Sequence, residues 1–306
     1  MAKNYAMVIV NPTAGSGATG RKWEKIREHL TESGLAYDYE FTRYRGHGIE
    51  LAHAASTDGY NFIIVVGGDG TVNEAANGIL NSPNRENTTL GVINTGTGSD
   101  FIRTVGTPKD PLEACKFLAR QERFLIDIGQ VEFYHDGVKT SRFFVNYCGT
   151  GFDSEVAEAT NRMPRPSFIS NTLPYLAALV CTLVRYRNRD IQLTIDGKSR
   201  QGRFLSVIVA NGRYFGGGMK IAPQAELSDG KLNVVTVEDI GKIELLKAFP
   251  RIYKGTHITH PKVSVALATS VQVTPEERMP VSADGELLGE GPVSFRLIPQ
   301  ALAIAR

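Results

Sequence analysis

Short β-rich runs alternate with amphipathic helical patterns through the first part of this 306-residue chain, and this alternation constrains the fold more than any other feature. The β-rich runs cover residues 5–10, 37–42, 62–66 and 90–94, and the helical patterns cover residues 21–33, 49–56, 72–80 and 111–120. Strands that alternate with helices form βαβ units, in which the strands run parallel and the helices cover the sheet. We therefore predict an α/β domain with a parallel sheet over residues 1–125.

The pattern changes near Phe124 to β-strands joined by tight turns. Hairpins are expected at Asp136-Gly137 and Asp196-Gly197, because Asp-Gly pairs favour two-residue hairpin turns. Strand candidates cover residues 131–134, 140–145, 205–210, 232–237, 271–274 and 293–298, and helices are expected near 172–186 and 243–253. Residues 126–298 are therefore predicted to form an antiparallel β-rich domain. Because no repeat or Pro-rich linker separates the halves, we expect a short junction near residues 122–127 and a cleft shared by the domains.

Charge and cysteine content exclude several classes of protein. The 34 Lys and Arg against 32 Asp and Glu leave a net charge of +2, so no strong field would hold nucleic acid on the surface. The three cysteines, Cys115, Cys148 and Cys181, form no Cys-x-x-Cys pair, which argues against a zinc site or disulfide framework and for a reducing cytoplasm. The longest apolar segment, residues 173–184, falls well short of the ~20 residues that a membrane span needs. We expect a soluble, cytoplasmic protein with no nucleic acid partner.

A glycine-rich string, Gly67-Gly68-Asp69-Gly70-Thr71, lies between a buried strand and a helix. Glycines let the backbone approach phosphate oxygens, and the amides that open a helix donate hydrogen bonds to an anion. Asp69, between these donors, has the chemistry to hold Mg²⁺ against phosphates. The structural alternative is a turn in which Asp69 or Thr71 caps the helix. The whole string on a strand-to-helix junction favours the phosphate site.

The loop after the first strand contains Gly15, Gly17 and Gly20 in a G-x-G-x-x-G pattern. A dinucleotide-binding fingerprint needs its first glycine at the strand end, whereas residues 11–14 intervene here after Val10. The Lys and Ser/Thr of a P-loop are also missing, because Arg21 and Lys22 follow Gly20. A flexible surface loop is the remaining structural alternative.

A third loop, residues 94–101, follows the strand at 90–94 and contains Gly96, Thr97 and Asp100. In an open parallel sheet, ligands bind beyond the carboxyl ends of the strands. The loops that contain Asn11, Gly67 and Gly96 are therefore expected to converge on one site.

This ordered set of motifs resembles the diacylglycerol-kinase-like lipid kinases, which include bacterial diacylglycerol kinases and, more distantly, sphingosine and ceramide kinases. The resemblance covers nearly the whole chain and rests on Asn11-Pro12 with Gly15, Thr42, His53-Ala54, Gly67 to Thr71 with Asn73-Glu74, Gly96-Thr97 with Asp100-Phe101 and Arg103, Asp127-Ile128-Gly129, Asp229-Gly230, and Asp284-Gly285-Glu286. It implies a nucleotide-binding α/β first domain, a β-sandwich second domain, and a C-terminal segment, residues 299–306, that returns to the first domain.

The resemblance also implies roles for individual residues. ATP would bind at Asn11, Pro12, Gly15, Thr42, Gly67, Gly68, Asp69, Gly70, Thr71, Asn73, Gly96, Thr97, Asp100, Arg103 and Asp127. Within this set, Asp69, Asp100 and Asp127 would belong to the network around a catalytic Mg²⁺. A second, structural Mg²⁺ would be held by Asp229 and by backbone oxygens of Glu226 and Lys231. Glu286 would be the general base toward a lipid hydroxyl, with Asp284 beside it to orient the cleft.

Two positions depart from the family pattern. Ser99 stands where the family usually has Asn, and Ser16 stands where some bacterial members carry a Lys that faces phosphate. Arg21 or Lys22 has the charge to replace that Lys, although both residues also suit an exposed helix start.

A lipid is the expected partner, most simply diacylglycerol. A homodimer is also possible. Peripheral membrane contact at the inner membrane surface is expected through the second domain, because basic residues that flank an apolar segment favour anionic lipid surfaces. The same segment also suits a core helix with solvated ends. The apolar residues are Phe168, Ile169, Leu173, Tyr175 and Leu176, and the basic residues are Arg162, Arg165, Arg185, Arg187 and Arg189. Two alternatives remain for the function: a kinase with the same glycine-rich string that acts on a sphingoid-like lipid or NAD, and a non-catalytic nucleotide- or lipid-binding protein.

Overall fold

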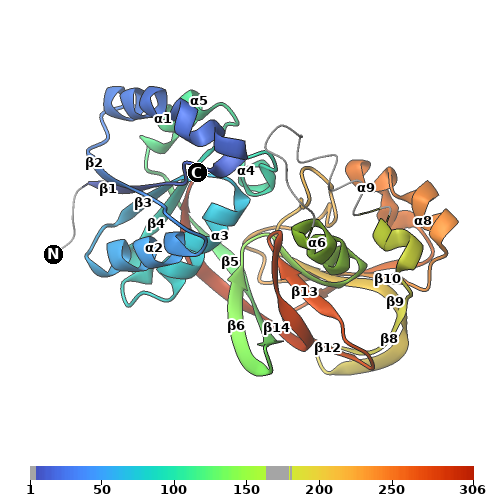
Figure 1. The fold of residues 1–306 in the computed structure, drawn as a ribbon. Helices are drawn as coiled ribbons and strands as arrows, with labels where there is room; N and C mark the ends of the chain where they lie inside the picture. Colours follow the sequence, from blue (N-terminus) through green and yellow to red (C-terminus); the bar gives the residue numbers. More distant parts are fainter. Residues whose placement is uncertain (1–4, 163–178, 180) are drawn as a thin grey trace. The chain divides into compact units, whose positions relative to one another are not determined.

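The computed structural model of the protein describes residues 5–162, 179 and 181–306 (Figure 1). The chain divides into two compact units. The first unit comprises residues 1–128, 216–218 and 298–306, and the second comprises residues 129–215 and 219–297. The protein is mixed α/β with a β-rich C-terminal part, as the sequence predicts. The sequence places the change of pattern at residues 122–127, and the units divide after Ile128.

The sheet of the first unit contains β1 (Ala6–Val10), β2 (Tyr37–Phe41), β3 (Phe62–Gly67) and β4 (Thr89–Asn94), together with the end of β14 (Glu286–Ala305). The strand order is β14, β4, β3, β1, β2, and each neighbouring pair is parallel. All residues of β3 are buried, which is typical of a strand covered on both faces. The register places Val10 beside Val66 and Gly67 beside Asn94. The loops after β1, β3 and β4 therefore begin at the same edge of the sheet.

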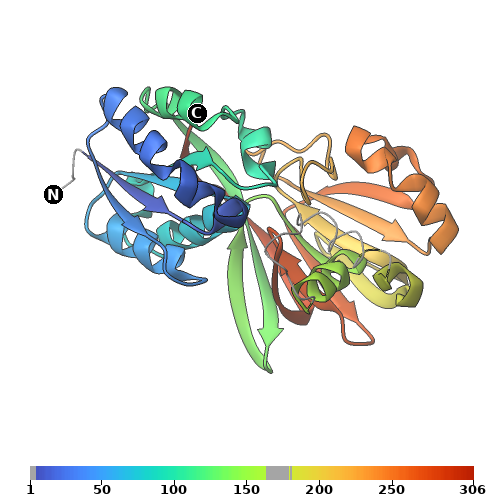
Figure 2. The same ribbon diagram turned by 45° about the horizontal axis from the view of Figure 1, so that its top comes forward.

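Helices cover both faces of this sheet (Figure 1 and Figure 2). α1 (Ala14–Glu32) and α5 (Pro111–Leu118) lie on one face, and α2 (His47–Thr57) and α3 (Asp69–Leu80) lie on the other. The short helices η1 (Arg85–Asn87) and α4 (Asp100–Val105) flank β4. α1 starts before the predicted residue 21, but Gly15, Ser16 and Gly17 have positive φ angles of 59°, 55° and 80°. The regular helix therefore begins only after this left-handed turn.

The second unit is built from antiparallel strands around a core that includes Phe144, Phe204 and Phe295. Its strands are β5 (Arg123–His135) from Gly129 onward, β6 (Val138–Phe144), β7 (Tyr147–Gly151), β8 (Arg189–Ile195), β9 (Lys198–Ala210), β10 (Leu232–Glu238), β11 (Val263–Ala268), β12 (Ser270–Pro275), β13 (Pro280–Ala283) and the first part of β14. One path runs β11, β10, β9, β7, β13, β14, and β8 pairs with β9 and β12. The predicted hairpins β5–β6 and β8–β9 are both confirmed.

Two sequence predictions about element boundaries were wrong. The strand predicted at 293–298 is part of the single strand β14, whose Ala303 and Ile304 pair with β4. Pro299 does not end this strand, because the φ of proline is compatible with extended backbone. The helix predicted at 243–253 is split into α8 (Lys242–Ala248) and α9 (Arg251–Lys254) at Pro250, because proline lacks the N–H that a continuous helix needs.

Among the residues that the structure describes, the second unit also contains α6 (Phe152–Arg162), helical residues at 181–185 and η2 (Thr256–Thr259). Figure 1 shows α6, α8 and α9 on the same side of the antiparallel strands. Most of the helix predicted at 172–186 lies outside the described residues. Within the described ranges, no helix combines the length and the apolar character that crossing a membrane requires.

Candidate active site

The loops after β1, β3 and β4 are joined by backbone hydrogen bonds, so the predicted convergence is present in the first unit. The amide of Asn11 donates to the carbonyl of Val66 at 2.9 Å, and the amide of Thr95 donates to the carbonyl of Gly67 at 2.8 Å. The Asn11 side chain also donates from Nδ2 to Oγ1 of Thr71 at 2.9 Å. The glycine-rich string therefore contacts both neighbouring loops.

Glycines allow these loops to approach each other closely. A β-carbon at Gly96 would lie 2.6 Å from the Cα of Gly68, and one at Gly15 would lie 2.5 Å from the carbonyl oxygen of Thr95. Both distances are too short for any other residue without movement of the backbone. The loops therefore present a compact surface of main chain, which is the kind of surface that phosphate groups bind.

Asp69 connects the second loop to the third. Its carboxylate accepts hydrogen bonds from the amide of Phe101 at 3.0 Å and from the amide of Asp100 at 3.2 Å. Gly68, the N-cap of α3, makes no side-chain capping bond. The carboxylate of Asp69 therefore does not cap its own helix, α3. It binds the first amides of α4 instead.

Asp100 is buried, and only one of its two carboxylate oxygens has a hydrogen-bond donor among the described residues. Its Oδ2 accepts a hydrogen bond from the amide of Gly217 at 2.8 Å, whereas Oδ1 has no hydrogen-bond partner among the residues that the structure describes. Burial, with the charge of Asp69 as a further cause, raises the pKa of Asp100 to about 7. A buried carboxylate oxygen without a donor, close to a second carboxylate, suits a hard cation better than an apolar packing role.

Asp127 lies on β5 and is fully buried. Its Oδ1 accepts a hydrogen bond from the amide of Gln300 at 2.8 Å, so it contacts the returning end of β14. In the described part of the chain, no three acidic, His or Cys side chains gather with the geometry of a metal site. Asp69, Asp100 and Asp127 together therefore do not form such a group.

Asp284 is buried in the second unit, in the turn between β13 and β14, with a φ of 47°. Its Oδ2 accepts from the amide of Val145 at 2.8 Å, and its Oδ1 accepts from the amides of Asn146 and Tyr147 at 3.0 Å each. The carboxylate thus binds three consecutive amides and fixes the backbone that enters β7.

Glu286 follows this turn as the first residue of β14. Its carboxylate forms an ion pair with the Arg142 guanidinium at 3.5 Å, and the exposed fractions of the two side chains are only 19% and 20%. Glu286 is therefore a partly buried, paired carboxylate and not a solvent-facing turn residue.

A residue that the sequence reasoning missed, Asp153, lies at the start of α6. Its Oδ1 accepts from Oγ of Ser206 at 3.0 Å, and its Oδ2 accepts from Oγ of Ser154 at 3.3 Å. Burial raises the pKa of Asp153 to about 6. A β-carbon at Gly149 would clash with the Asp153 carboxylate, so glycine at this position leaves room for that side chain. The sequence signal was Gly149-Thr150-Gly151-Phe152-Asp153, a further glycine-containing string at a strand-to-helix junction.

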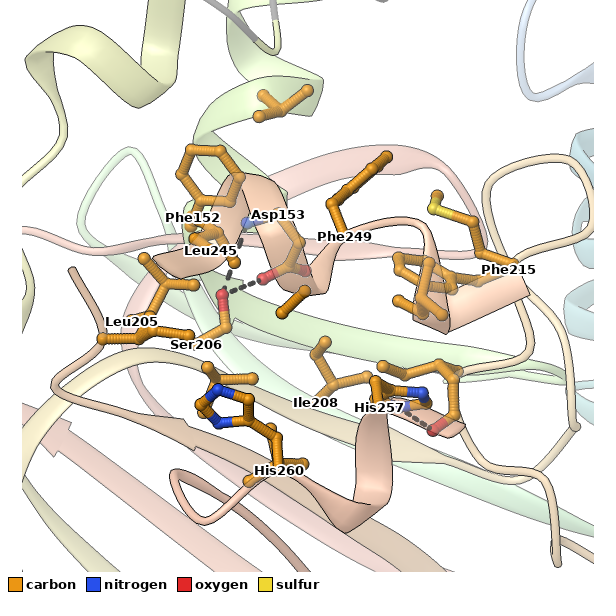
Figure 3. Close-up of a pocket in the computed structure, with 18 of the residues that line it drawn as sticks. Phe152, Asp153, Leu205, Ser206, Ile208, Phe215, Leu245, Phe249, His257 and His260 are labelled. Atoms are coloured by element: carbon orange, nitrogen blue, oxygen red, sulfur yellow. Dashed lines mark hydrogen bonds between the residues drawn. The ribbon is translucent and has the colours of Figure 1, made fainter. Parts of the chain in front are cut away.

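Asp153 and Ser206 border an apolar cavity of about 100 Å³ in the second unit (Figure 3). Almost all other lining side chains are hydrocarbon, including Leu205, Ile208, Phe215, Leu245 and Phe249. Two histidines complete the wall. His257 is buried, which lowers its pKa, and binds the carbonyl of Ile221 at 3.0 Å, and His260 lies 3.4 Å from the carboxylate of Glu244.

Two family models match successive parts of the chain. The diacylglycerol kinase catalytic domain matches residues 5–131, and the YegS C-terminal NAD kinase beta sandwich-like domain matches residues 146–306. The chain is also 30% identical to a diacylglycerol kinase of Staphylococcus carnosus over 302 residues, which cover 99% of this chain and 95% of that protein. The chain belongs to the diacylglycerol kinase family. It is therefore a lipid kinase, and a kinase family implies ATP as the phosphoryl donor.

Other members agree with this assignment. A diacylglycerol kinase of Mycobacterium tuberculosis is 30% identical, with coverage of 97% of this kinase and 94% of its own length. A solved structure of a candidate diacylglycerol kinase from Bacillus anthracis str. Sterne gives a TM-score of 0.80 at 27% identity and covers 99% of this chain and 95% of that chain. The matched catalytic domain contains the three joined loops, and the sandwich-like domain contains Asp153, Asp284 and Glu286.

The other predicted nucleotide residues of this lipid kinase lie around the same loops. The Thr42 amide donates to the carbonyl of Val10 at 2.9 Å, and the Gly20 amide donates to the carbonyl of Pro12 at 3.1 Å. Asn73 is buried within α3, where its carbonyl and side-chain oxygens accept from Asn77. Thr97 and Arg103 are exposed.

Arg21, within α1, supplies one positive charge near the loop that follows β1. The Arg21 guanidinium donates to the carbonyl of Ser16 at 3.2 Å and so turns back toward the loop. In the β4 loop, Nδ2 of Asn94 donates to Oγ of Ser99 at 2.6 Å. Ser99 thus retains a polar contact at the position where the family usually has Asn.

The predicted structural metal site is an exposed turn of the second unit. Oδ1 of Asp229 accepts a hydrogen bond from the amide of Lys231 at 2.9 Å, and Gly230 between them has a φ of 71°. The side chain of Glu226 is exposed. A carboxylate at a tight turn beside backbone carbonyls has the oxygen donors that Mg²⁺ prefers, so the ligand set is chemically suitable.

Proposed function

We propose that this lipid kinase transfers the γ-phosphoryl group of ATP to the hydroxyl group of diacylglycerol and so forms phosphatidate. The observation that carries the proposal is the meeting of three glycine-containing loops beside Asp69 and Asp100 in the first unit. Phosphoryl transfer requires the protein mainly to position the phosphates and to neutralise their charge. Backbone amides of the Gly15, Gly67 and Gly96 loops would hold the phosphates, and Arg21 and Arg103 would add positive charge.

Mg²⁺ is the proposed cofactor, with Asp69 and Asp100 as the residues that hold it. Two carboxylates suit Mg²⁺, which commonly takes one or two protein carboxylates and completes its coordination with water and phosphate oxygens. When bound, Mg²⁺ would neutralise charge that develops on the phosphates. Asp127 would support this site through its bond to Gln300, which holds the returning strand in place. The Asp229 turn is proposed as a separate, structural Mg²⁺ site.

Glu286 is the proposed general base for the acceptor hydroxyl. A base must be held in a fixed position, and the ion pair with the Arg142 guanidinium at 3.5 Å restrains the Glu286 carboxylate. Asp284 would act as a positioning residue, because its carboxylate fixes the amides of residues 145–147 and the turn that precedes Glu286. Glu286 would thus accept the proton of the lipid hydroxyl as the hydroxyl oxygen bonds to the γ-phosphorus, the bond from that phosphorus to the bridging oxygen breaks, and ADP leaves.

The cavity beside Asp153 is the proposed site for part of the lipid. Its hydrocarbon lining suits an acyl chain, and the polar border of Asp153 and Ser206 suits a hydroxyl or ester group. At about 100 Å³ the cavity is smaller than the roughly 300–1,000 Å³ of sites that enclose whole ligands. It would therefore take part of one acyl chain and leave the rest of the lipid outside.

We further propose a cytoplasmic protein that contacts the inner membrane surface, because diacylglycerol resides in bilayers. Of the basic residues considered above, Arg162 pairs with Glu158 at 2.9 Å, and Arg189 pairs with Glu155 at 3.2 Å. The apolar residues Phe168, Ile169, Leu173, Tyr175 and Leu176, and the basic residue Arg165, lie outside the described residues. The homodimer stays a prediction.

An acceptor panel tests the proposal. The protein is incubated with ATP labelled at the γ-phosphate, Mg²⁺, and separately with dispersed diacylglycerol, sphingosine or NAD. We expect label in phosphatidate at a rate far above that of the other acceptors. Label transferred only to NAD or only to sphingosine would replace the proposed acceptor, and ATP binding without transfer to any acceptor would contradict the assignment as a kinase of these substrates.

A further inference from the structure

The segment formed by α8 and α9 has apolar side chains on two faces. Its inner side contributes Leu245 and Phe249 to the wall of the Asp153 cavity (Figure 3), and Ile252 lines the same cavity. Three other apolar side chains of the segment are exposed to solvent: Ile243 by 72%, and Leu246 and Tyr253 by 53% each. Single exposed apolar residues are ordinary, but three on one short segment above a hydrocarbon cavity form a surface that binds another apolar body. We define Ile243, Leu246 and Tyr253, with the basic residues between and beside them, as the α8–α9 face.

The charge of this segment is strongly positive. Residues 242–254 contain four cations and one acid, a formal charge of 4 − 1 = +3, whereas the whole chain carries only +2. The single acid is Glu244. Its carboxylate lies 3.4 Å from His260 and 3.6 Å from Lys262, so it contacts basic side chains outside this segment. The cations are Lys242, Lys247, Arg251 and Lys254.

An open hollow of about 770 Å³ lies beside α8 and contains three of these cations, Lys242, Lys247 and Arg251, together with Glu244 and His260. A hollow with three cations and one paired acid attracts an anionic group such as a phosphate ester. Exposed apolar side chains next to it need an apolar phase. An anionic phospholipid surface provides both an anionic group and an apolar phase. The phosphate head groups lie at the surface, and the acyl chains lie directly beneath them.

We propose that the α8–α9 face docks on an anionic lipid bilayer and thereby places the Asp153 cavity at the membrane surface. This inference rests on the proposed function, in which the substrate is a bilayer lipid that enters the cavity only in part. Basic residues near the surface are attracted to anionic lipids, and apolar residues such as Ile243 and Leu246 insert at the boundary between head groups and acyl chains. Because the same segment forms the cavity wall, docking brings the acceptor site to its substrate.

The charge pattern also distinguishes this occupant from a second copy of the chain. A two-fold dimer through the α8–α9 face would bring the same +3 segments together, and like charges across an interface are unfavourable. An acidic protein partner would satisfy the cations, but it would not explain why the exposed apolar side chains adjoin a hydrocarbon cavity. The observations therefore favour the bilayer.

Vesicle flotation with the full chain tests the proposal. Vesicles of phosphatidylcholine alone are compared with vesicles that also contain phosphatidylglycerol. We expect wild type to float only with the anionic vesicles and binding to weaken as salt rises. Ile243→Glu and Lys247→Glu should each weaken binding at least about tenfold. The matched controls are Val138→Glu, at a 66% exposed apolar residue, and Lys198→Glu, at an exposed lysine of another hairpin, and both should stay within about twofold of wild type.

A parallel assay with a short-chain diacylglycerol in solution separates the two claims. Its turnover should be equal in wild type and all four variants, because none of these residues lines the cavity. Failure of wild type to phosphorylate the soluble lipid would count against the proposed function alone, since flotation reports docking independently. Docking is overturned if Ile243→Glu and Lys247→Glu float like the controls, if wild type binds neutral vesicles equally well, or if wild type dimerises through this face and does not float.

Discussion

Oδ2 of Asp69 accepts a hydrogen bond from the amide of Asp100 at 3.2 Å, although the two residues follow different strands of the sheet. The first residue of α3 therefore fixes the first residue of α4. A β-carbon at Gly98 would lie 2.5 Å from the same carboxylate oxygen, so the third loop closes tightly over Asp69. The two carboxylates are held as one unit, in which a change at Asp69 also alters the position of Asp100. This unit is the part of the proposed mechanism that neutralises phosphate charge.

Gly96→Ala should weaken ATP binding. The new β-carbon would lie 2.6 Å from the Cα of Gly68, so the two phosphate-facing loops must move apart. Such overpacking costs about 1–3 kcal/mol of stability, and we expect ATP affinity to fall at least about tenfold. Calorimetric titration with ATP and thermal unfolding measure both effects. Gly241→Ala is the matched control, because no atom lies within 4 Å of its β-carbon and its φ of −74° suits alanine. Equal ATP affinity in wild type and Gly96→Ala would contradict the loop arrangement.

The convergence of these loops was predictable because parallel strands end at the same sheet edge, and the hydrophobic runs of β1, β3 and β4 are unambiguous. The particular contacts were not predictable. The sequence cannot distinguish an Asp69 that caps α3 from an Asp69 that binds the first amides of α4, because the same glycine-rich string is compatible with both roles. The start of α1 was also misplaced, because Gly15 and Gly17 read as a loop although the helix adjoins them directly.

Stability should depend on pH through Asp153. Its pKa is raised from 3.8 to about 6 by burial, so between these values the folded state keeps a proton that the unfolded state has released. The contribution of Asp153 to the free energy of unfolding is therefore largest below about pH 4. It falls by about 3 kcal/mol in total as the pH rises toward 6. Asp153→Asn removes the titration while keeping an oxygen that accepts from Ser206. Denaturant unfolding between pH 4 and 7 should therefore show a flatter stability profile for the variant, and parallel profiles would exclude this role.

Glu286→Gln should reduce kcat by roughly 10²-fold or more, in the range typical of a lost general base. ATP affinity should be unchanged, because the nucleotide loops lie in the first unit. Glu290→Gln is the matched control: it is on the same strand and forms an ion pair with Arg278 at 2.6 Å, but we assign it no chemical role. Steady-state phosphorylation of dispersed diacylglycerol measures kcat. If both variants stay within about twofold of wild type, Glu286 is not the base.

Mg²⁺ should raise the melting temperature of wild type, because a ligand that binds only the folded state stabilises it by mass action. Asp229→Ala should show a smaller gain in the same titration, since its carboxylate is the only charged oxygen donor proposed for the structural site. The variant also loses the bond to the Lys231 amide, so the comparison concerns the gain with Mg²⁺ and not the starting temperature. An identical gain would remove Asp229 from metal binding.

The second unit shows where sequence reasoning stops. The β5–β6 hairpin was predictable from its Asp-Gly turn, but β7 was missed because two glycines in five residues weaken the strand signal. The missed strand carries Gly149, which leaves room for Asp153. The contacts of Asp153 with Ser206, and of Asp284 with Val145, join residues far apart in the chain. Such pairings depend on strand register in three dimensions, which a single sequence does not specify.

Turnover by Asp69→Ala tests the central claim most directly. Asp110→Ala is the control, because Asp110 likewise accepts from two amides, those of Leu112 and Glu113, at a helix start. Each variant should lose about 1 kcal/mol of stability from the missing cap. With γ-labelled ATP, Mg²⁺ and dispersed diacylglycerol, we predict that Asp110→Ala forms phosphatidate at nearly the wild-type rate and that Asp69→Ala forms none above background. Wild-type turnover by Asp69→Ala, at a temperature where the variant is folded, would contradict the proposed phosphoryl-transfer site.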